Sequence, residues 1–229
     1  THNPATTISR VYTYTVTGIV PCANATATVT VTENIAANAG TNGTLTVCSD
    51  GASLSLNSGL FGTPQAGGTW TGPSAVAGGN YDPATMAAGA YTYTVAGTAP
   101  CANATATVTV TESVAANAGG NGTLAICSNG TAVALSTSLS GTPQAGGAWS
   151  GPSAVVGGNY DPASMTAGVY TYTVAGVAPC ANSTANVIVT ENSAANAGTS
   201  GTLTVCSTSA TVALSTGLSG TPQIGGAWS

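Results

Sequence analysis

The sequence repeats itself with a period of 79 residues, and this feature constrains the fold more than any other. The string PCANATATVTVTE occupies residues 21–33, returns unchanged at 100–112, and returns at 179–191 as PCANSTANVIVTE. Two further motifs, GTLTVCS and GTPQAGGTW, keep the same spacing through three copies with few substitutions. Because near-identical sequences fold alike, one small module must be used several times along the chain.

The repeat register divides the chain into complete and partial modules. The complete modules are residues 36–112 and 115–191, and the partial ones are residues 1–33, the back of a module, and 194–229, the front. Residue 1 is equivalent to residue 80, and residue 229 is equivalent to residue 150. The chain is therefore eight residues shorter than three full periods. Two interpretations follow: a stretch cut from a longer polymer, or a subunit whose partial modules are completed by its neighbours through strand complementation.

Charged side chains are scarce, and this excludes several classes of function. They make up 3% of the residues, against about 25% in an ordinary soluble domain, and the net charge is −5. One arginine without lysine cannot neutralise a nucleic-acid backbone or hold an anionic membrane surface, and no apolar run is long enough for membrane insertion. The scattered carboxylates and single histidine also predict no enzyme, no cofactor and no metal site.

Short alternating segments predict an all-β fold. Residues 44–47 and 52–56 alternate apolar with small polar residues around the turn Ser49-Asp50-Gly51, which predicts a pair of antiparallel strands. Residues 90–95 and 104–111 are the strongest strand predictions. Because no apolar period of 3.6 residues occurs, the pattern favours a β-sandwich over a fold that alternates strands and helices.

The aromatic residues refine this expectation. Immunoglobulin-like sandwiches carry a core tryptophan on the third strand and a tyrosine that closes a corner by bonding backwards through its hydroxyl. Trp70, followed about twenty residues later by Tyr91 and Tyr93, fits that pattern with Tyr91 as the corner residue. We therefore expect tandem immunoglobulin-like β-sandwich modules with a 79-residue repeat. Their expected core residues are Trp70, Trp149, Trp228, Tyr91, Tyr93, Tyr170 and Tyr172.

Six cysteines occupy two positions per repeat. Cys48, Cys127 and Cys206 stand before one strand, and Cys22, Cys101 and Cys180 follow another. We favour pairing inside each module, Cys48–Cys101 and Cys127–Cys180, which leaves Cys22 and Cys206 to partners outside the chain or in a neighbouring subunit. If the two flanking strands run in the same direction, these cysteines lie at opposite ends, and Cys48–Cys180 between successive modules is the alternative. Either scheme predicts an oxidising compartment.

An almost uncharged surface should associate with something, because charges keep domains apart. Neighbouring copies in a filament could cover this surface, and so could surface glycans. Six sequons of the N-x-S/T type are candidates for glycosylation, at Asn24, Asn42, Asn103, Asn121, Asn129 and Asn182. Asp82, which precedes Pro83, is expected to initiate a turn by accepting backbone N–H groups, and Glu112 is expected to be a solvated strand end.

The combination of LTVC, GTPxAGGxWxGP, YDPAxxxAGxYTYTVxGxAPCAN and ATVTVTE resembles the tandem repeats of large flavobacterial (Bacteroidetes) surface proteins. These are gliding-motility-associated, adhesin-like proteins exported by type IX secretion. The resemblance implies an extracellular, cell-surface immunoglobulin-like repeat in a long stalk, adhesin or filament, and it does not imply catalysis. We therefore expect a structural repeat subunit of a filament or stalk, with copies of itself as partners. The alternative is an adhesin module that recognises glycan or another cell surface.

Overall fold

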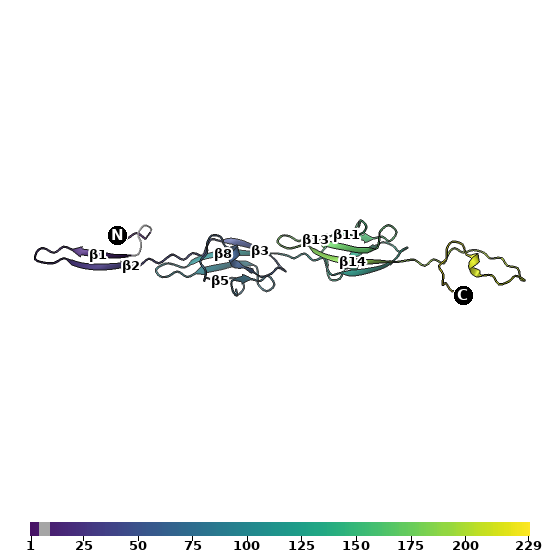
Figure 1. The fold of residues 1–229 in the computed structure, drawn as a ribbon, viewed down its shortest axis with the longest axis horizontal. Helices are drawn as coiled ribbons and strands as arrows, with labels where there is room; N and C mark the ends of the chain where they lie inside the picture. Colours follow the sequence, from purple (N-terminus) through teal and green to yellow (C-terminus); the bar gives the residue numbers. More distant parts are fainter. Residues whose placement is uncertain (5–9) are drawn as a thin grey trace. The chain divides into compact units, whose positions relative to one another are not determined.

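The computed structural model describes residues 1–4 and 10–229, so residues 5–9 of the expected segment 1–33 lie outside the described part. Strands and turns dominate, and within the described residues the only helices are three short 3₁₀ helices (Figure 1). The prediction of an all-β chain is confirmed. The chain forms two compact units: Thr1–Ala115 with Val177–Cys180, and Ala116–Gly176 with Ala181–Ser229.

The first unit contains a hairpin and one complete module (Figure 1). Its elements are β1 (Arg10–Val16), β2 (Ala25–Val31), β3 (Gly43–Cys48), β4 (Leu54–Ser55), the 3₁₀ helix η1 (Leu56–Gly59), β5 (Thr69–Thr71), β6 (Asn80–Tyr81), β7 (Gly89–Val95) and β8 (Ala104–Ser113). Strands β1 and β2 pair with each other. The module has a four-stranded sheet in the order β3-β8-β7-β5 and a two-stranded sheet of β4 and β6. Within it β3 runs parallel to β8, and the other pairs are antiparallel.

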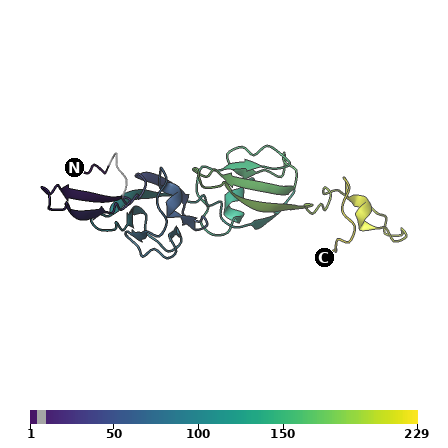
Figure 2. The ribbon, with the colours of Figure 1, turned by 60° about the vertical axis from the view of Figure 1, so that its left-hand side comes forward.

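The second unit repeats this arrangement, and Figure 2 shows its strands from another direction. Its elements are β9 (Gly122–Cys127), β10 (Val133–Ala134), η2 (Leu135–Ser138), β11 (Ala148–Ser150), β12 (Asn159–Tyr160), β13 (Gly168–Val174), β14 (Ser183–Asn192) and η3 (Leu214–Gly217). One sheet has the order β11-β13-β14-β9, and β10 pairs with β12. The segment that carries η3 corresponds to the front of a module.

Strands β3 and β4 do not form the hairpin that the sequence predicts. They belong to different sheets, because β3 pairs in parallel with β8 from Gly43 opposite Val108 to Cys48 opposite Ser113. The Ser49 amide donates to the carbonyl of Ser113 at 2.9 Å, so the chain stays with β8 to its last residue before it turns away. The alternating pattern is correct for half-buried strands, but it carries no information about the partner strand.

The core of the first module is formed by alternate residues of the two long strands. Tyr91 and Tyr93 of β7 and Val108 and Val110 of β8 are buried, while the threonines between them are not. Tyr81 from the smaller sheet packs edge-to-face against Tyr91, with ring centroids 5.6 Å apart. Both sheets therefore contribute to one core, and the second module repeats it with equivalent residues.

Two glycines, one in the GTPQAGGTW motif and one two residues after it, lie against tyrosine rings. The Gly68 amide donates to the hydroxyl of Tyr93 at 2.9 Å, and this hydroxyl donates to the carbonyl of Gln65 at 2.7 Å. A Cβ atom on Gly68 would lie 2.5 Å from the Tyr93 ring, and one on Gly72 would lie 2.2 Å from the Tyr91 ring. Only glycine fits this close approach of backbone to ring.

Candidate functional site

The corner tyrosines make the backward bond that their spacing predicts. The hydroxyl of Tyr91 donates to the carbonyl of Ala87 at 2.7 Å, and that of Tyr170 donates to Thr166 at 2.6 Å. Tyr91, Tyr93, Tyr170 and Tyr172 are all buried. Each corner bond holds the segment that enters β7 or β13 against the first residues of that strand.

The tryptophans are less buried than expected. Trp70 and Trp149 are half-buried beside Tyr93 and Tyr172, with ring centroids 5.0 and 4.9 Å apart. Trp228, expected in the core, is 60% exposed. The reason is that its segment, the front of a module, does not include the tyrosine strand against which the other two tryptophans pack.

A shallow groove lies beside each half-buried tryptophan. In the first module Asn57, Gly68 and Trp70 line it, and Asn57 accepts a hydrogen bond from the indole Nε1 at 3.3 Å. The groove beside Trp149 is lined by equivalent residues. Neither lining includes a charged, cysteine or histidine side chain.

The sequence did not predict a hydrogen bond between a buried tyrosine and a carboxylate near a strand end. Tyr81 is fully buried and donates to Oε1 of Glu112 at 2.5 Å, and Tyr160 makes the same bond to Glu191 at 3.2 Å. Burial, followed by the bond to Glu112, raises the pKa of the Tyr81 hydroxyl, and the same causes raise the pKa of Tyr160 to about 12. Glu112 is exposed near the end of β8, as expected, and it also accepts the hydrogen bond of Tyr81, which the sequence did not predict.

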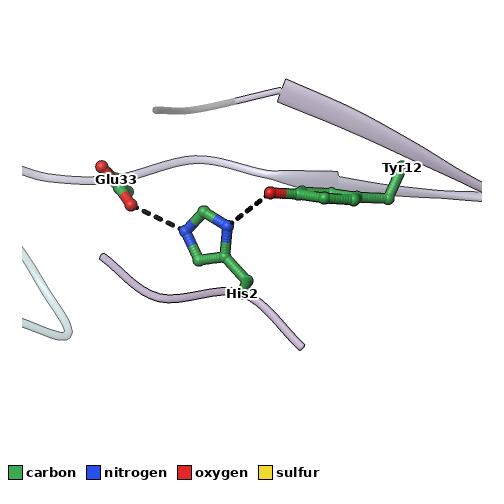
Figure 3. Close-up of polar contacts among 3 residues, drawn as sticks. All are labelled: His2, Tyr12 and Glu33. Carbon is green, nitrogen blue, oxygen red and sulfur yellow. Dashed lines mark hydrogen bonds and ion pairs between the residues drawn. The ribbon is translucent and has the colours of Figure 1, made fainter. Parts of the chain in front are cut away.

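His2 stands in the first partial module where the complete modules have Tyr81 and Tyr160. Its Nε2 lies 2.7 Å from Oε1 of Glu33, and its Nδ1 lies 2.8 Å from the hydroxyl of Tyr12 (Figure 3). The His2 and Tyr12 rings meet edge-on with centroids 5.6 Å apart, like the two tyrosines of the complete module. The lone histidine thus belongs to a structural contact.

The two proline-linked aspartates act as the sequence predicts. The carboxylate of Asp82 accepts the amide of Ala84 and the hydroxyl of Thr85, both at 3.0 Å. Asp161 makes the equivalent bonds. These carboxylates hold turns, and their hydrogen bonds account for them without a role in chemistry.

The disulfide joins Cys48 to Cys180, with Cα atoms 4.9 Å apart. The favoured pairings, Cys48–Cys101 and Cys127–Cys180, are therefore wrong, and the alternative is present. Cys48 lies opposite Ser113 at the end of β8, whereas Cys101 precedes the first residue of that ten-residue strand. A strand of this length spans roughly 30 Å, far beyond the reach of a disulfide.

The loop residues Val177–Cys180 belong to the first unit and are held there by further contacts. The Ser113 hydroxyl donates to the carbonyl of Ala178 at 3.3 Å, and Sγ of Cys180 lies 3.2 Å from the Ser113 carbonyl oxygen. That carbonyl also accepts the amide of Ser49. The last residue of β8 therefore joins three segments: its own strand, the turn after Cys48, and the hairpin loop of the next repeat.

The same docking occurs one repeat earlier. Asn34, equivalent to Ser113, donates through Nδ2 to the carbonyl of Ala99 at 2.7 Å, and Sγ of Cys101 lies 3.4 Å from the Asn34 carbonyl oxygen. Cys101 nevertheless carries a free thiol. The other free cysteines of the described residues are Cys22, Cys127 and Cys206. Cys48, Asp50 and Cys180 lie within 4.8 Å of one another, but the two sulfurs are bonded together and leave no metal site.

All six sequon asparagines are exposed, and five of them have a local structural role. Oδ1 of Asn24, Asn103 and Asn182 accepts a glycine amide across its hairpin loop at 3.0 Å. Oδ1 of Asn42 and Asn121 accepts an amide of the neighbouring strand at 2.8 Å. Glycosylation would modify Nδ2, and these bonds do not involve that atom.

No protein-family model matches this chain, and no curated protein matches it. Within the described residues, no helix has the length and apolar character needed to cross a bilayer. The function is therefore inferred from the geometry of the chain's own residues.

Proposed function

We propose that the chain is a structural repeat subunit of an extracellular bacterial filament or cell-surface stalk. The observation that carries this proposal is the Cys48–Cys180 disulfide, which ties the strand end of one repeat to the hairpin loop of the next. A covalent bond between consecutive repeats resists their separation, which is a mechanical property rather than a catalytic one. A disulfide also fits an oxidising environment outside the cytosol.

The architecture we propose is an immunoglobulin-like sandwich. Its support is the strand order β3-β8-β7-β5 with β3 parallel to β8, the separate β4–β6 pair, and the corner bond of Tyr91. The 79-residue repeat then places equivalent modules in tandem along the chain.

The segments that begin each repeat are held firmly, as a stalk requires. The Asn38 amide donates to Oε1 of Gln65, and the Gln65 amide donates to the Asn38 carbonyl, both at 2.8 Å. Nδ2 of Asn38 donates to the carbonyl of Thr63 at 3.0 Å. The same bonds recur at Asn117 and Asn196. The AANAG motif is thus held by hydrogen bonds to its own module.

Electron microscopy of the oxidised protein at low concentration tests the filament. We expect uniform filaments with an axial repeat of roughly 30–40 Å per module, the length of strands of about ten residues. Dispersed single particles over a range of protein concentrations and ionic strengths would contradict the proposal. A sample treated with reductant is the control for assembly that depends on disulfides.

The grooves beside Trp70 and Trp149 favour a second candidate, an adhesin module that binds glycan. Half-exposed tryptophan beside amide and backbone groups is suited to stacking against a sugar ring. A screen against immobilised glycans tests this function. Binding that is lost in the double variant Trp70→Phe/Trp149→Phe, which keeps aromatic rings in place, would support it, and no binding by the wild-type chain would reject it.

A further inference from the structure

The Cys48–Cys180 disulfide gives the chain a second, much shorter covalent route along its length. The two residues are 132 positions apart in the sequence, but their Cα atoms are 4.9 Å apart, and both lie in the first unit. A tension that runs along the backbone from before Cys48 to beyond Cys180 can therefore pass through the two sulfur atoms. Residues 49–179, called the bypassed span below, form a closed loop beside this route.

The bypassed span contains most strands of the two complete modules. It includes β4 to β8 of the first module and β9 to β13 of the second. The fully buried tyrosines Tyr81, Tyr91, Tyr160 and Tyr170 all lie within it. Of the strands in these modules, β3 precedes the disulfide and β14 follows it. A tension that passes through the disulfide is therefore carried by β3 and β14, and not by the strands between them.

These two strands are already extended. β3 runs from Gly43 to Cys48, and β14 runs from Ser183 to Asn192. A β-strand rises roughly 3.3 Å per residue, which is close to the roughly 3.3–3.6 Å of a fully stretched chain. Tension therefore gains almost no length from β3 and β14. A strand that is pulled equally at both ends also transmits the force along its own backbone, so it exerts no net pull on the strand beside it.

Without the disulfide, the same tension has to pass through the modules. In the first module it would enter at Gly43, the start of β3, and leave at Ser113, the end of β8. Because β3 and β8 run parallel, these two ends would be pulled in opposite directions along the strands, and the hydrogen bonds between the strands would carry the load. Separation of the pair would remove Val47 from the core that it shares with Val108 and Val110.

We propose that the Cys48–Cys180 disulfide limits the extension of the chain under tension. It carries the load past the bypassed span, so that pulling does not draw out the modules, and its reduction makes the span extensible. The inference deepens the proposed stalk function and rests on it for the source of the tension.

The folded structure protects the disulfide. Cys48 and Cys180 are each 8% exposed. The Ser113 hydroxyl donates to the carbonyl of Ala178 at 3.3 Å, and the Ser113 carbonyl accepts the amide of Ser49 at 2.9 Å. The hairpin loop is thus held against the strand end on both sides of the sulfur atoms. Since thiol–disulfide exchange requires access to a sulfur atom, the bypass persists while the first module is folded.

Reduction is an exchange with a dithiol reductant. One thiolate of the reductant attacks a sulfur atom of the disulfide, forms a mixed disulfide and releases the other cysteine as a thiolate. The second thiolate of the reductant then displaces the first cysteine. Two electrons and two protons pass from the reductant to the protein, which gains two thiols, and the reductant becomes a cyclic disulfide.

The length that reduction releases follows from the sequence separation of the two cysteines. A stretched chain spans at most about 3.3–3.6 Å per residue. The 132 positions from Cys48 to Cys180 therefore correspond to about 430–470 Å after the 4.9 Å between their Cα atoms is subtracted. The reduced chain should be longer than the oxidised chain by this amount at full extension.

Single-molecule pulling of the full chain tests the bypass. The two ends of the chain are attached to DNA handles, and iodoacetamide caps the free thiols of every sample. The samples are oxidised wild type, wild type reduced with dithiothreitol before capping, and Cys48→Ser/Cys180→Ser. The reduced chain and the variant should show additional unfolding steps and a stretched length about 430–470 Å greater than that of the oxidised chain. Equal stretched lengths would overturn the inference.

Two matched insertions show which residues carry the load. Each is a segment of about ten residues that contains the recognition site of a specific protease, and it stretches to about 33–36 Å. One follows Ala145, inside the bypassed span, and the other follows Ile224, outside it. These positions are equivalent in the repeat, and at both the next residue is a glycine whose Cβ position has no atom within 4 Å.

The two insertions should behave differently in the oxidised chain. The insertion after Ala145 should lengthen the stretched chain only when it is reduced, and protease should break only the reduced tether. The insertion after Ile224 should lengthen the chain in both states, and protease should break both tethers. An oxidised tether that lengthens or breaks through the insertion after Ala145 would overturn the inference.

Electron microscopy of the same oxidised preparation, before capping, separates this inference from the filament proposal. Filaments of a chain that stretches equally with and without the disulfide would overturn the bypass and support the filament. Dispersed particles of a chain that shows the expected difference in length would support the bypass and overturn the filament.

Discussion

The hydroxyl group of Tyr81, which no solvent reaches, donates a hydrogen bond to Oε1 of Glu112 at 2.5 Å. Tyr81 lies in β6 of the small sheet, and Glu112 lies near the end of β8 in the large sheet. The bond therefore joins the two sheets. It lies near the Cys48–Cys180 disulfide, because Glu112 pairs with Val47, the residue before Cys48 in β3. It links the module core to the module end.

Loss of this bond should destabilise the first module. Replacement of Tyr81 by Phe keeps the ring but removes the donor, and a hydrogen bond to a charged group contributes about 1.5–3 kcal/mol. We expect Tyr81→Phe to lower the free energy of unfolding in urea by that amount. Tyr14→Phe, at an exposed ring, is the matched control and should change it by less than about 0.5 kcal/mol.

The raised pKa of Tyr160 predicts a loss of stability at alkaline pH. The unfolded tyrosine loses its proton near its ordinary pKa of 10, whereas the folded one keeps it up to about 12. The unfolded chain therefore binds fewer protons in this window, so stability is complete below pH 10 and falls as the pH approaches 12. Urea titrations from pH 8 to 12 should show a shallower fall for Tyr160→Phe, and an unchanged slope in that variant would contradict the assignment.

The Cys48–Cys180 bond should stabilise the folded chain. It closes a loop across 132 residues, and bonds that close loops of this size contribute about 3–5 kcal/mol by restricting the unfolded chain. Calorimetry of Cys48→Ser/Cys180→Ser should show a lower melting temperature than the wild type. Cys22→Ser, at an exposed free thiol, should melt like the wild type at a concentration where the chain is monomeric.

Gly68→Ala should disrupt the first module. The added Cβ would lie 2.5 Å from the Tyr93 ring, which is held by its neighbours in the core. We expect overpacking of at least about 1–3 kcal/mol, measured as a loss of stability in urea. Recovery of wild-type stability in Gly68→Ala would show that the ring can move aside.

The repeat, the all-β class, and the alternating strands β7 and β8 could be predicted from the amino-acid order, because these depend on local patterns. Tyr91 bonds backwards over four residues and Asp82 over two or three, so their spacing was enough to predict both contacts. The groups that carry such contacts are neighbours in the chain, and the tertiary structure cannot separate them.

Contacts between segments far apart in the chain could not be predicted in this way. The parallel pairing of β3 with β8 places Cys48 at the far end of β8 from Cys101 and beside Cys180, and it separates β3 from β4. Tyr81 reaches Glu112 across 31 residues in the same way. An alternating pattern records which face of a strand is buried but not which strand lies beside it, so partners far apart in the chain follow from the fold alone.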